Sequence, residues 1–353
     1  METQHPVVLQ LTAGNLKKRM MRYFRCGIAL LSLLLTGTLY GQGRVSGLAF
    51  GDFYYIARHH NAELEGQNGF WIRRIYLTYD QKLDETFAWR LRLEMNSPGN
   101  FTAGNATPFV KDAYLRWKLN DLHALYLGIS SSALFNLVES VWGYRSVEKA
   151  PADLQKLGSS REFGVALKGR LTRDGRVRYH ATFGNGEGTK AEGYRGKKLA
   201  LALQFFPSRP LILESYVDYA RLQQGASLTT WHLFGAYRTE GFRAGVVYER
   251  QRVRAAGGSD RMLRYVSGFV VGRVQERMHL LVRMDRLLDP NPKGASISYL
   301  PFATTSKATL WILGVDVAVA PQVHFIPNIE WITYDQEALR ADLYLRGTFY
   351  FRF

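Results

Sequence analysis

The C-terminal stretch Arg340-Ala-Asp-Leu-Tyr-Leu-Arg-Gly-Thr-Phe-Tyr-Phe-Arg-Phe353 decides the fold class. Its apolar side chains share one parity: Leu343, Leu345, Phe349, Phe351 and Phe353. Its polar and cationic side chains share the other: Tyr344, Arg346, Thr348, Tyr350 and Arg352. Successive side chains of a strand point to opposite faces, so this strand has an apolar face and a polar one. An exposed aromatic edge strand would aggregate in water, whereas it suits the closing strand of a membrane barrel. We therefore predict an all-β transmembrane antiparallel barrel, with Phe349, Phe351 and Phe353 as its assembly signal.

The same alternation recurs upstream, most clearly in Phe87-Ala-Trp-Arg-Leu-Arg-Leu-Glu-Met-Asn96. A helix would scatter these charges around its circumference, so the pattern favours a strand. Sixteen such runs are expected, near 43–58, 69–80, 86–97, 109–119, 122–130, 162–171, 176–184, 197–206, 211–222, 228–239, 242–254, 262–272, 276–287, 307–318, 322–333 and 341–353. Sixteen is an even number, as bacterial single-chain barrels require, and is large enough to leave an aqueous lumen.

The connections between these runs alternate in length. Short ones such as Asn120-Asp121, Arg173-Asp-Gly175 and Glu240-Gly241 interleave with longer ones such as 59–68, 98–108, 131–161, 185–196 and 288–306. Outer-membrane barrels have short periplasmic turns opposite longer extracellular loops. The pattern therefore places both ends of the barrel domain, residues 42–353, on the periplasmic side.

Residues 1–41 read as an N-terminal extension followed by a cleavable signal peptide. Arg22 and Arg25 precede an apolar run from Gly27 to Leu35, which is too short for a spanning helix. Cys26, the only cysteine, lies within this segment, so no disulfide or thiolate metal site is expected in the exported protein. We expect export to the outer membrane of a Gram-negative-type bacterium, with the barrel-assembly machinery and outer-membrane lipids as partners.

The barrel domain is basic. Residues 1–41 hold five of the 46 Lys and Arg and one of the 30 Asp and Glu, so residues 42–353 keep a net charge of +12. Such an excess indicates an anionic partner. A charge at the membrane midplane costs about 2–4 kcal/mol, so basic residues opposite apolar ones should face the lumen. The pore-lining candidates are Arg90, Arg92, Arg116, Lys118, Lys168, Arg170, Arg178 and Arg283. They predict either selective passage of anions or a general, weakly selective pore.

The longest connection, 131–161, is unusually apolar for a loop, with Phe135, Trp142 and Tyr144. It could fold into the barrel and narrow it, pack against a neighbouring subunit, or form its own cluster at the surface. Its basic residues Arg145, Lys149, Lys156 and Arg161 are the constriction candidates.

Three stretches resemble the phosphate-selective porin O and P family: Gly69-Phe-Trp-Ile-Arg-Arg-Ile-Tyr-Leu77, Lys111-Asp-Ala-Tyr-Leu-Arg116 and Ser159-Ser-Arg-Glu-Phe-Gly-Val-Ala-Leu-Lys-Gly169. The resemblance implies a sixteen-stranded porin, a homotrimer, whose basic lumen passes small anions such as phosphate. The expected lumen of this chain is rich in arginine and also contains Glu94, Glu214 and Asp285, which departs from the lysine cluster of the phosphate-specific members.

Other functions find little support. The sequence has no Gly-x-Ser-x-Gly elbow, His-Glu-x-x-His pair or phosphate loop, so no catalytic residues and no cofactor are predicted. The His59-His60 pair falls at a loop edge and is not expected to bind a metal. Nucleic acid is not an expected partner, because a signal peptide precedes the barrel. The alternatives that stay open are a closed or plugged barrel with a structural or adhesive role and an outer-membrane hydrolase.

Overall fold

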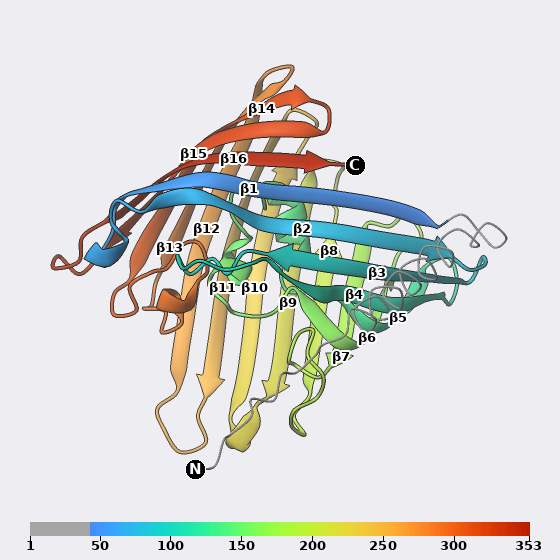
Figure 1. The fold of residues 1–353 in the computed structure, drawn as a ribbon. Helices are drawn as coiled ribbons and strands as arrows, with labels where there is room; N and C mark the ends of the chain where they lie inside the picture. The colour runs from blue at the N-terminus through green and yellow to red at the C-terminus, as the bar shows by residue number, and fades with distance from the viewer. Residues whose placement is uncertain (1–42) are drawn as a thin grey trace, which may run out of the picture. The chain divides into compact units, whose positions relative to one another are not determined.

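The computed structural model describes residues 43–353, and this part of the chain forms a barrel of sixteen strands (Figure 1). The predicted signal peptide lies outside the described residues. The strands are β1 (Arg44–Arg58), β2 (Asn68–Lys82), β3 (Phe87–Asn96), β4 (Thr107–Lys118), β5 (His123–Ser131), β6 (Arg161–Arg170), β7 (Val177–Gly184), β8 (Lys198–Phe205), β9 (Leu211–Arg221), β10 (Ser227–Arg238), β11 (Phe242–Arg254), β12 (Arg261–Gln275), β13 (Met278–Leu287), β14 (Ala308–Ala320), β15 (Val323–Tyr334) and β16 (Asp342–Arg352).

The connections contain short helical pieces: α2 (Asn136–Trp142), α3 (Pro151–Leu154), η1 (Ala62–Leu64), η2 (Gln223–Gly225) and η3 (Gly294–Ser296). Within residues 43–353, none of the helices has the length and hydrophobicity needed to cross a membrane.

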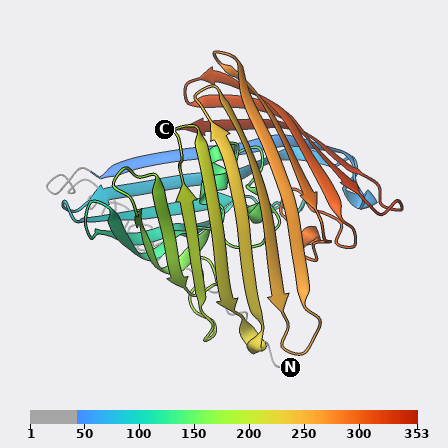
Figure 2. The same ribbon diagram turned by 180° about the vertical axis from the view of Figure 1, so that it is seen from behind.

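The barrel closes through pairing of its first and last strands. Each strand is antiparallel to its sequence neighbours, and β1 pairs with β16, as the views from opposite sides show (Figures 1 and 2). At the end of the chain, the Phe353 and Gly47 backbones exchange two hydrogen bonds of 3.0 Å. Closure gives the backbone N–H and C=O groups of the two edge strands hydrogen-bond partners, which hydrocarbon cannot supply. The predicted sixteen-stranded barrel is confirmed, and β12, expected to end at 272 and ending at Gln275, shows the largest boundary difference.

The two faces of the wall differ as the alternation predicts. In β9, Leu211, Leu213 and Val217 are exposed on the outside, while Glu214 and Asp218 are buried on the inside. A soluble protein would not display such a continuous apolar exterior, whereas hydrocarbon solvates it. The alternation of short turns and longer loops is also confirmed, so the barrel has a short-turn end and a long-loop end.

β-Bulges interrupt the alternation of inward and outward side chains where charged residues turn toward the lumen. Between β1 and β2, Phe50 pairs with Arg74 and Gly51 with Ile72, which leaves Arg73 as an extra residue. A Cβ on Gly51 would lie 2.2 Å from the Trp71 carbonyl oxygen, so this bulge requires glycine. An extra residue shifts the parity of the strand beyond it, so a bulge can turn a side chain to the other face. Sequence alternation alone did not predict these shifts.

Candidate functional site

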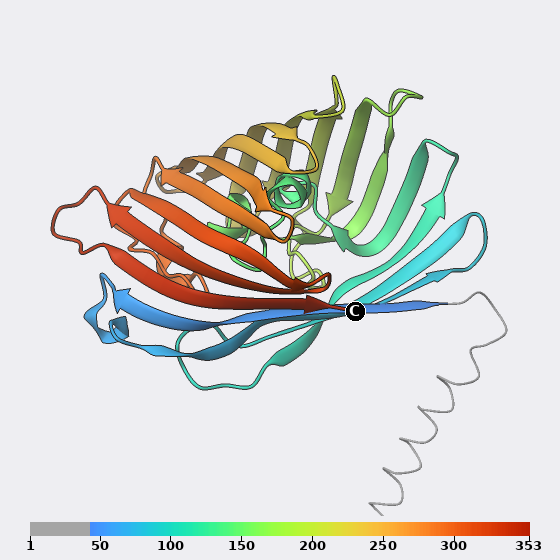
Figure 3. The same cartoon turned by 90° about the horizontal axis from the view of Figure 1, so that it is seen from above.

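The connection 131–161, which carries α2 and α3, runs through the inside of the barrel. Figure 3, a view from above, shows α2 within the ring of strands. Lumen-facing residues of distant strands hold it. Arg73 of β2 donates to Glu148 Oε2 at 2.6 Å, and Asp316 of β14 accepts from the Tyr144 hydroxyl at 2.9 Å. Arg283 of β13 donates to the Lys149 carbonyl oxygen. These contacts attach the loop to β2, β13 and β14.

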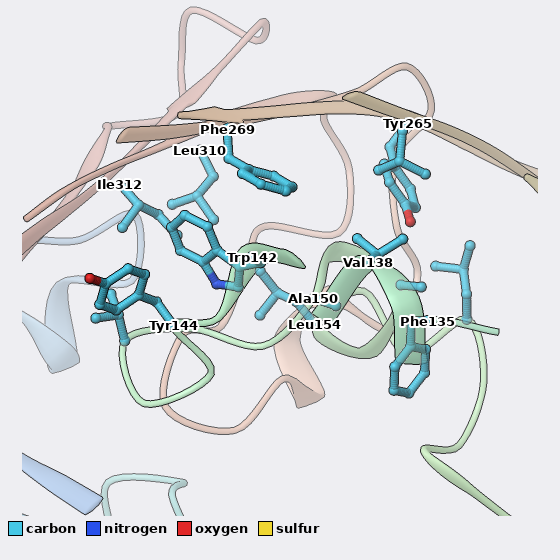
Figure 4. Close-up of a cluster of buried hydrophobic side chains, with 14 of the residues drawn as sticks. Phe135, Val138, Trp142, Tyr144, Ala150, Leu154, Tyr265, Phe269, Leu310 and Ile312 are labelled. Carbon is cyan, nitrogen blue, oxygen red and sulfur yellow. The ribbon is translucent and has the colours of Figure 1, made fainter. Parts of the chain in front are cut away.

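An apolar patch on the inner wall seats the loop (Figure 4). Trp142 has no exposed surface, and its ring centroid lies 5.4 Å from that of Phe269. Leu310 and Ile312 of β14, both fully buried, face the same cluster. The inner face of β12 and β14 is therefore partly apolar, and the loop covers it. Burial of these side chains removes from water the apolar surface that made a free loop improbable.

Charged groups on β15, β16 and β1, the strands that lie between β14 and β2, complete the attachment. Arg346 of β16 contacts Glu330 at 2.8 Å and Asp52 at 3.2 Å, and all three side chains are buried beside Arg73. Burial acts to raise the pKa of Glu148, but the charge of Arg73 reverses this effect and lowers the pKa to about 2. Glu148 is therefore ionised at neutral pH and paired with the barrel wall.

The lumen beside the loop contains cavities that open at both ends of the barrel. A cavity of about 790 Å³ opens at the long-loop end, between the second half of the 131–161 loop and β8, β11 and β12. A second, of about 390 Å³, opens at the short-turn end beside Arg44 and Arg352. Lys111 and Ser160 line both cavities, so the two approach each other at these residues. A third, also of about 390 Å³, lies at the short-turn end between β4 and β8.

The linings are predominantly basic. The short-turn cavity beside Arg352 has six basic residues and one acid: Arg44, Arg92, Lys111, Arg145, Arg161 and Arg352, with Glu139. The third cavity has five basic residues and one acid: Arg116, Lys118, Lys168, Arg170 and Arg178, with Asp121. The long-loop cavity has seven and four: Arg74, Lys111, Lys156, Lys190, Lys198, Arg261 and Lys293, with Glu94, Asp153, Glu162 and Glu187. Cations in excess along a confined lumen produce a potential that attracts anions.

Many of the basic residues are partly neutralised. Arg92 and Arg161 share Asp112, and Arg74 and Lys111 share Glu94 at 2.8 and 2.9 Å. Arg145 pairs with Glu139 and Asp153 within the loop. In contrast, Arg116, Lys168, Arg170 and Arg178 have no carboxylate within ion-pair distance among the described residues; Lys168 instead donates to Ser131 Oγ at 2.7 Å. The third cavity is thus the least compensated part of the lumen.

Most of the predicted pore-lining and constriction residues line one of the three cavities. Arg92, Arg145 and Arg161 line the short-turn cavity beside Arg352, Lys156 lines the long-loop cavity, and Arg116, Lys118, Lys168, Arg170 and Arg178 line the third cavity. Arg90 forms a pair with Asp80 at 2.6 Å.

Two of the candidates differ from this arrangement. Arg283 faces inward but has no exposed surface and is paired with Asp285, so it holds the loop and does not line water. Lys149 is also buried, which lowers its pKa to about 8. Alternation places Arg283 inside the barrel but does not show that the loop covers it, and it predicts nothing about the burial of Lys149, which lies in the loop itself.

The alternation of side chains along the strands did not predict two inward-facing cations, because β-bulges turn them toward the lumen. Lys111 has the parity of the outward-facing Leu115 and Trp117. Between β3 and β4, however, Arg92 pairs with Asp112 and Leu93 with Val110, so Lys111 is the extra residue and turns inward. Arg73 is turned inward by the bulge opposite Gly51 in the same way. The adjacent charges Arg73-Arg74 and Lys111-Asp112 were the available signal, since a regular strand would expose one of each pair to lipid.

The aromatic residues of the closing strand lie where the alternation predicts. Phe351 and Phe353 are exposed on the outer face at the short-turn end, with exposed fractions of 42% and 68%. Their suggested role as an assembly signal remains a prediction.

Comparison with solved structures gives the fold. The chain is similar to an anion-selective porin from Comamonas acidovorans, with a TM-score of 0.64 and 11% identity over 89% of this chain and 100% of that one. This is a porin fold. A complex of Salmonella typhi OmpF with daunomycin gives a TM-score of 0.63 and 9% identity over 89% and 98% of the two chains. The outer membrane channel DcaP of Acinetobacter baumannii gives 0.60 and 10% over 90% and 99%.

Sequence comparison adds nothing to this result. No protein-family model matches the chain, and no curated protein matches it. The resemblance to phosphate-selective porins therefore stays a prediction from the three stretches that suggested it.

Proposed function

We propose that this protein is an outer-membrane porin, a water-filled channel for small solutes that prefers anions. The observation that supports this proposal most directly is the pair of basic cavities that approach each other at Lys111 and Ser160 from opposite ends of the barrel. The fold likeness is consistent with a channel, and one of the similar structures is an anion-selective porin. Phosphate is a candidate solute, because its charge suits arginine-lined surfaces.

The proposal extends to location and assembly. An apolar exterior with the short turns at one end fits the outer membrane, with the long loops outside and both strand termini facing the periplasm. We expect a homotrimer; one of the similar structures, Vibrio cholerae OmpT, is described as a trimer form. The signal peptide and the assembly signal at Phe349, Phe351 and Phe353 belong to the same proposal, and no enzymatic activity is proposed.

Recording from the purified protein in a planar lipid bilayer tests the proposal. Steady conductance, with a reversal potential in a KCl gradient that favours chloride, is expected. Phosphate added to one side should reduce the chloride current if it occupies the basic lumen. A reversal potential that favours potassium would contradict the anion preference.

The second candidate function is a plugged barrel with a structural or adhesive role. The attachment of the 131–161 loop to β2, β13 and β14 favours it. Absence of conductance from protein that is correctly folded and inserted would support this alternative over the porin.

A further inference from the structure

Two histidines and an aspartate meet at the long-loop end of the seam between β1 and β16. His59 and His60 directly follow β1, and Asp342 is the first residue of β16. Their ligand atoms all lie within 4.8 Å of one another. His60 Nδ1 is 2.9 Å from Asp342 Oδ2, and His59 Nε2 is 3.9 Å from the same oxygen. This cluster takes no part in the proposed pore.

A β-bulge brings His59 to this position. Ile56 pairs with Tyr344, whereas Arg58 pairs with Leu343, so Ala57 is an extra residue in β1. Without it, His59 would have the parity of Phe53 and Tyr55, which face outward. With it, His59 points inward and toward Asp342, and only 1% of its surface is exposed. Bulges are often found where a strand must re-aim a functional side chain.

The nitrogen of His59 that faces the cluster has no hydrogen-bond partner. Nε2 of His59 is buried and unpaired. At the other side of the ring, Nδ1 accepts a hydrogen bond of 2.9 Å from the Asn61 backbone N–H, and the Asn61 carbonyl oxygen lies 3.2 Å from the same nitrogen. In that tautomer Nε2 carries the proton; when Nδ1–H donates to the Asn61 carbonyl oxygen instead, the Nε2 lone pair is free, which is the arrangement that metal-binding histidines use. Buried polar atoms are normally satisfied, and this unpaired nitrogen lies beside two further metal-binding groups, His60 and Asp342.

The carboxylate is already oriented for a ligand. Asp342 has no exposed surface, and it accepts hydrogen bonds of 2.6 Å from the Tyr334 hydroxyl and from the His60 backbone N–H. The Tyr334 hydroxyl also lies 3.2 Å from His60 Nδ1. Hydrogen bonds of this kind fix the direction of metal-binding carboxylates. The His60 side chain keeps 15% of its surface exposed, which gives an ion access from solvent.

We propose that His59 Nε2, His60 Nδ1 and Asp342 Oδ2 bind a divalent transition-metal ion such as Zn²⁺. Two neutral imidazoles and one carboxylate form a donor set that Zn²⁺ uses in proteins, with water at the remaining position. Ca²⁺ and Mg²⁺ prefer sites built from oxygen alone. Zn²⁺ binds these donors at about 2.0–2.2 Å, so the three atoms, which lie within 4.8 Å of one another, must adjust their positions to surround it.

The site would join the two strands that close the barrel. His59 and His60 belong to the chain that leaves β1, and Asp342 begins β16, so a shared ion links the first and last strands at their long-loop ends. Binding does not require solute passage, and a barrel that conducts nothing could still contain this site. Failure of one proposal therefore leaves the other standing.

Titration of the full-length protein, folded in detergent micelles, tests the site. Zn²⁺ titrated in a calorimeter should bind with one ion per chain, and Co²⁺ should develop the visible absorption of a nitrogen- and oxygen-ligated ion. The single substitutions His59→Gln, His60→Gln and Asp342→Asn should each weaken Zn²⁺ binding at least tenfold. His324→Gln is the matched control, because His324 pairs with Asp316 at 2.8 Å and no third ligand completes a metal-binding group there within residues 43–353.

Several outcomes would overturn the assignment. Absence of a one-to-one Zn²⁺ transition would do so, and so would a Co²⁺ spectrum that is the same in His59→Gln and in the unmodified protein. Circular dichroism establishes that each variant is folded. If a variant does not fold, the unmodified protein still decides: Zn²⁺ should raise its unfolding temperature more than Mg²⁺ does, since a ligand that binds only the folded state stabilises it. Equal effects of the two ions would contradict a transition-metal site.

Discussion

Replacing Glu148 by glutamine tests how the loop is held in the lumen. The carboxylate of Glu148 accepts a hydrogen bond of 2.6 Å from Arg73 Nη2 and has no exposed surface. Glu330 and Asp52 are the other buried acids of this cluster, and Arg73 and Arg346 are its cations. The substitution therefore leaves two cations and two acids on the wall. It removes the negative charge of Glu148 and leaves the buried charges of the wall balanced. Loss of Arg73 would instead leave buried acids without a cation partner.

The magnitude follows from the pKa of Glu148. Burial acts to raise this pKa, and Arg73 and Lys149 lower it, with a net fall from 4.5 to about 2; because Lys149 belongs to the loop itself, the corresponding figure of roughly 3 kcal/mol is an upper limit for the docking of the ionised loop. Glutamine has the shape of the protonated side chain and keeps one acceptor for Arg73. The docking equilibrium should therefore fall by up to about a hundredfold.

Single-channel recording measures this change. Unmodified protein should show a steady level at neutral pH, and Glu148→Gln should show frequent excursions to a larger conductance as the loop leaves its seat. The control is Glu85→Gln in an exposed turn, where the carboxylate pairs with Lys82 far from the loop.

Lowering the pH tests the carboxylate of Glu148 independently of the substitution. The folded-state pKa of Glu148 is depressed, so its contribution is complete above pH 4.5 and is lost as the pH falls toward about 2. The unmodified protein should approach the behaviour of Glu148→Gln across this range. The reasoning is refuted if Glu148→Gln behaves like Glu85→Gln at neutral pH, or if acid affects Glu148→Gln and the unmodified protein equally.

Three further substitutions test the seat of the loop, the lumen charge and the bulge. Trp142→Ala should lose about 3–5 kcal/mol of loop packing and make residues 131–161 sensitive to limited proteolysis; unchanged cleavage would contradict this role. Lys168→Gln combined with Arg178→Gln removes two uncompensated lumen cations, so the reversal potential should move toward cation passage, and an unmoved potential would count against the basic lumen. Gly51→Ala should lower the unfolding temperature followed by circular dichroism, because its Cβ would meet the Trp71 carbonyl. Gly272→Ala, where nothing lies within 4 Å, should change it little, and equal shifts would refute the requirement for glycine.

Alternation along the strands predicted the barrel and the general direction of its charges. The last strand, Asp342–Arg352, already shows an apolar and a polar parity, and the structure places Leu345 and Phe351 outside and Arg346 inside. The prediction works because two different solvents select the two faces of every strand, and each residue records that choice locally. The length of each connection likewise records which end of the barrel it occupies.

The loop and its partners could not be predicted in this way. The sequence left three positions open for residues 131–161, and only the folded chain brings Glu148 to Arg73 and Trp142 to Phe269. The apolar inner patch of β12 and β14 gave no distinct signal, because a strand that is apolar on both faces resembles any buried strand.

What the sequence by itself determined is therefore the barrel, its sixteen strands and a basic interior. The tertiary structure alone decided which side chains break the alternation: Arg73, Lys111 and His59 reach the interior through bulges. The physical reason is that a bulge depends on the register between two strands, so it is a property of the pair and is absent from the periodicity of either strand alone.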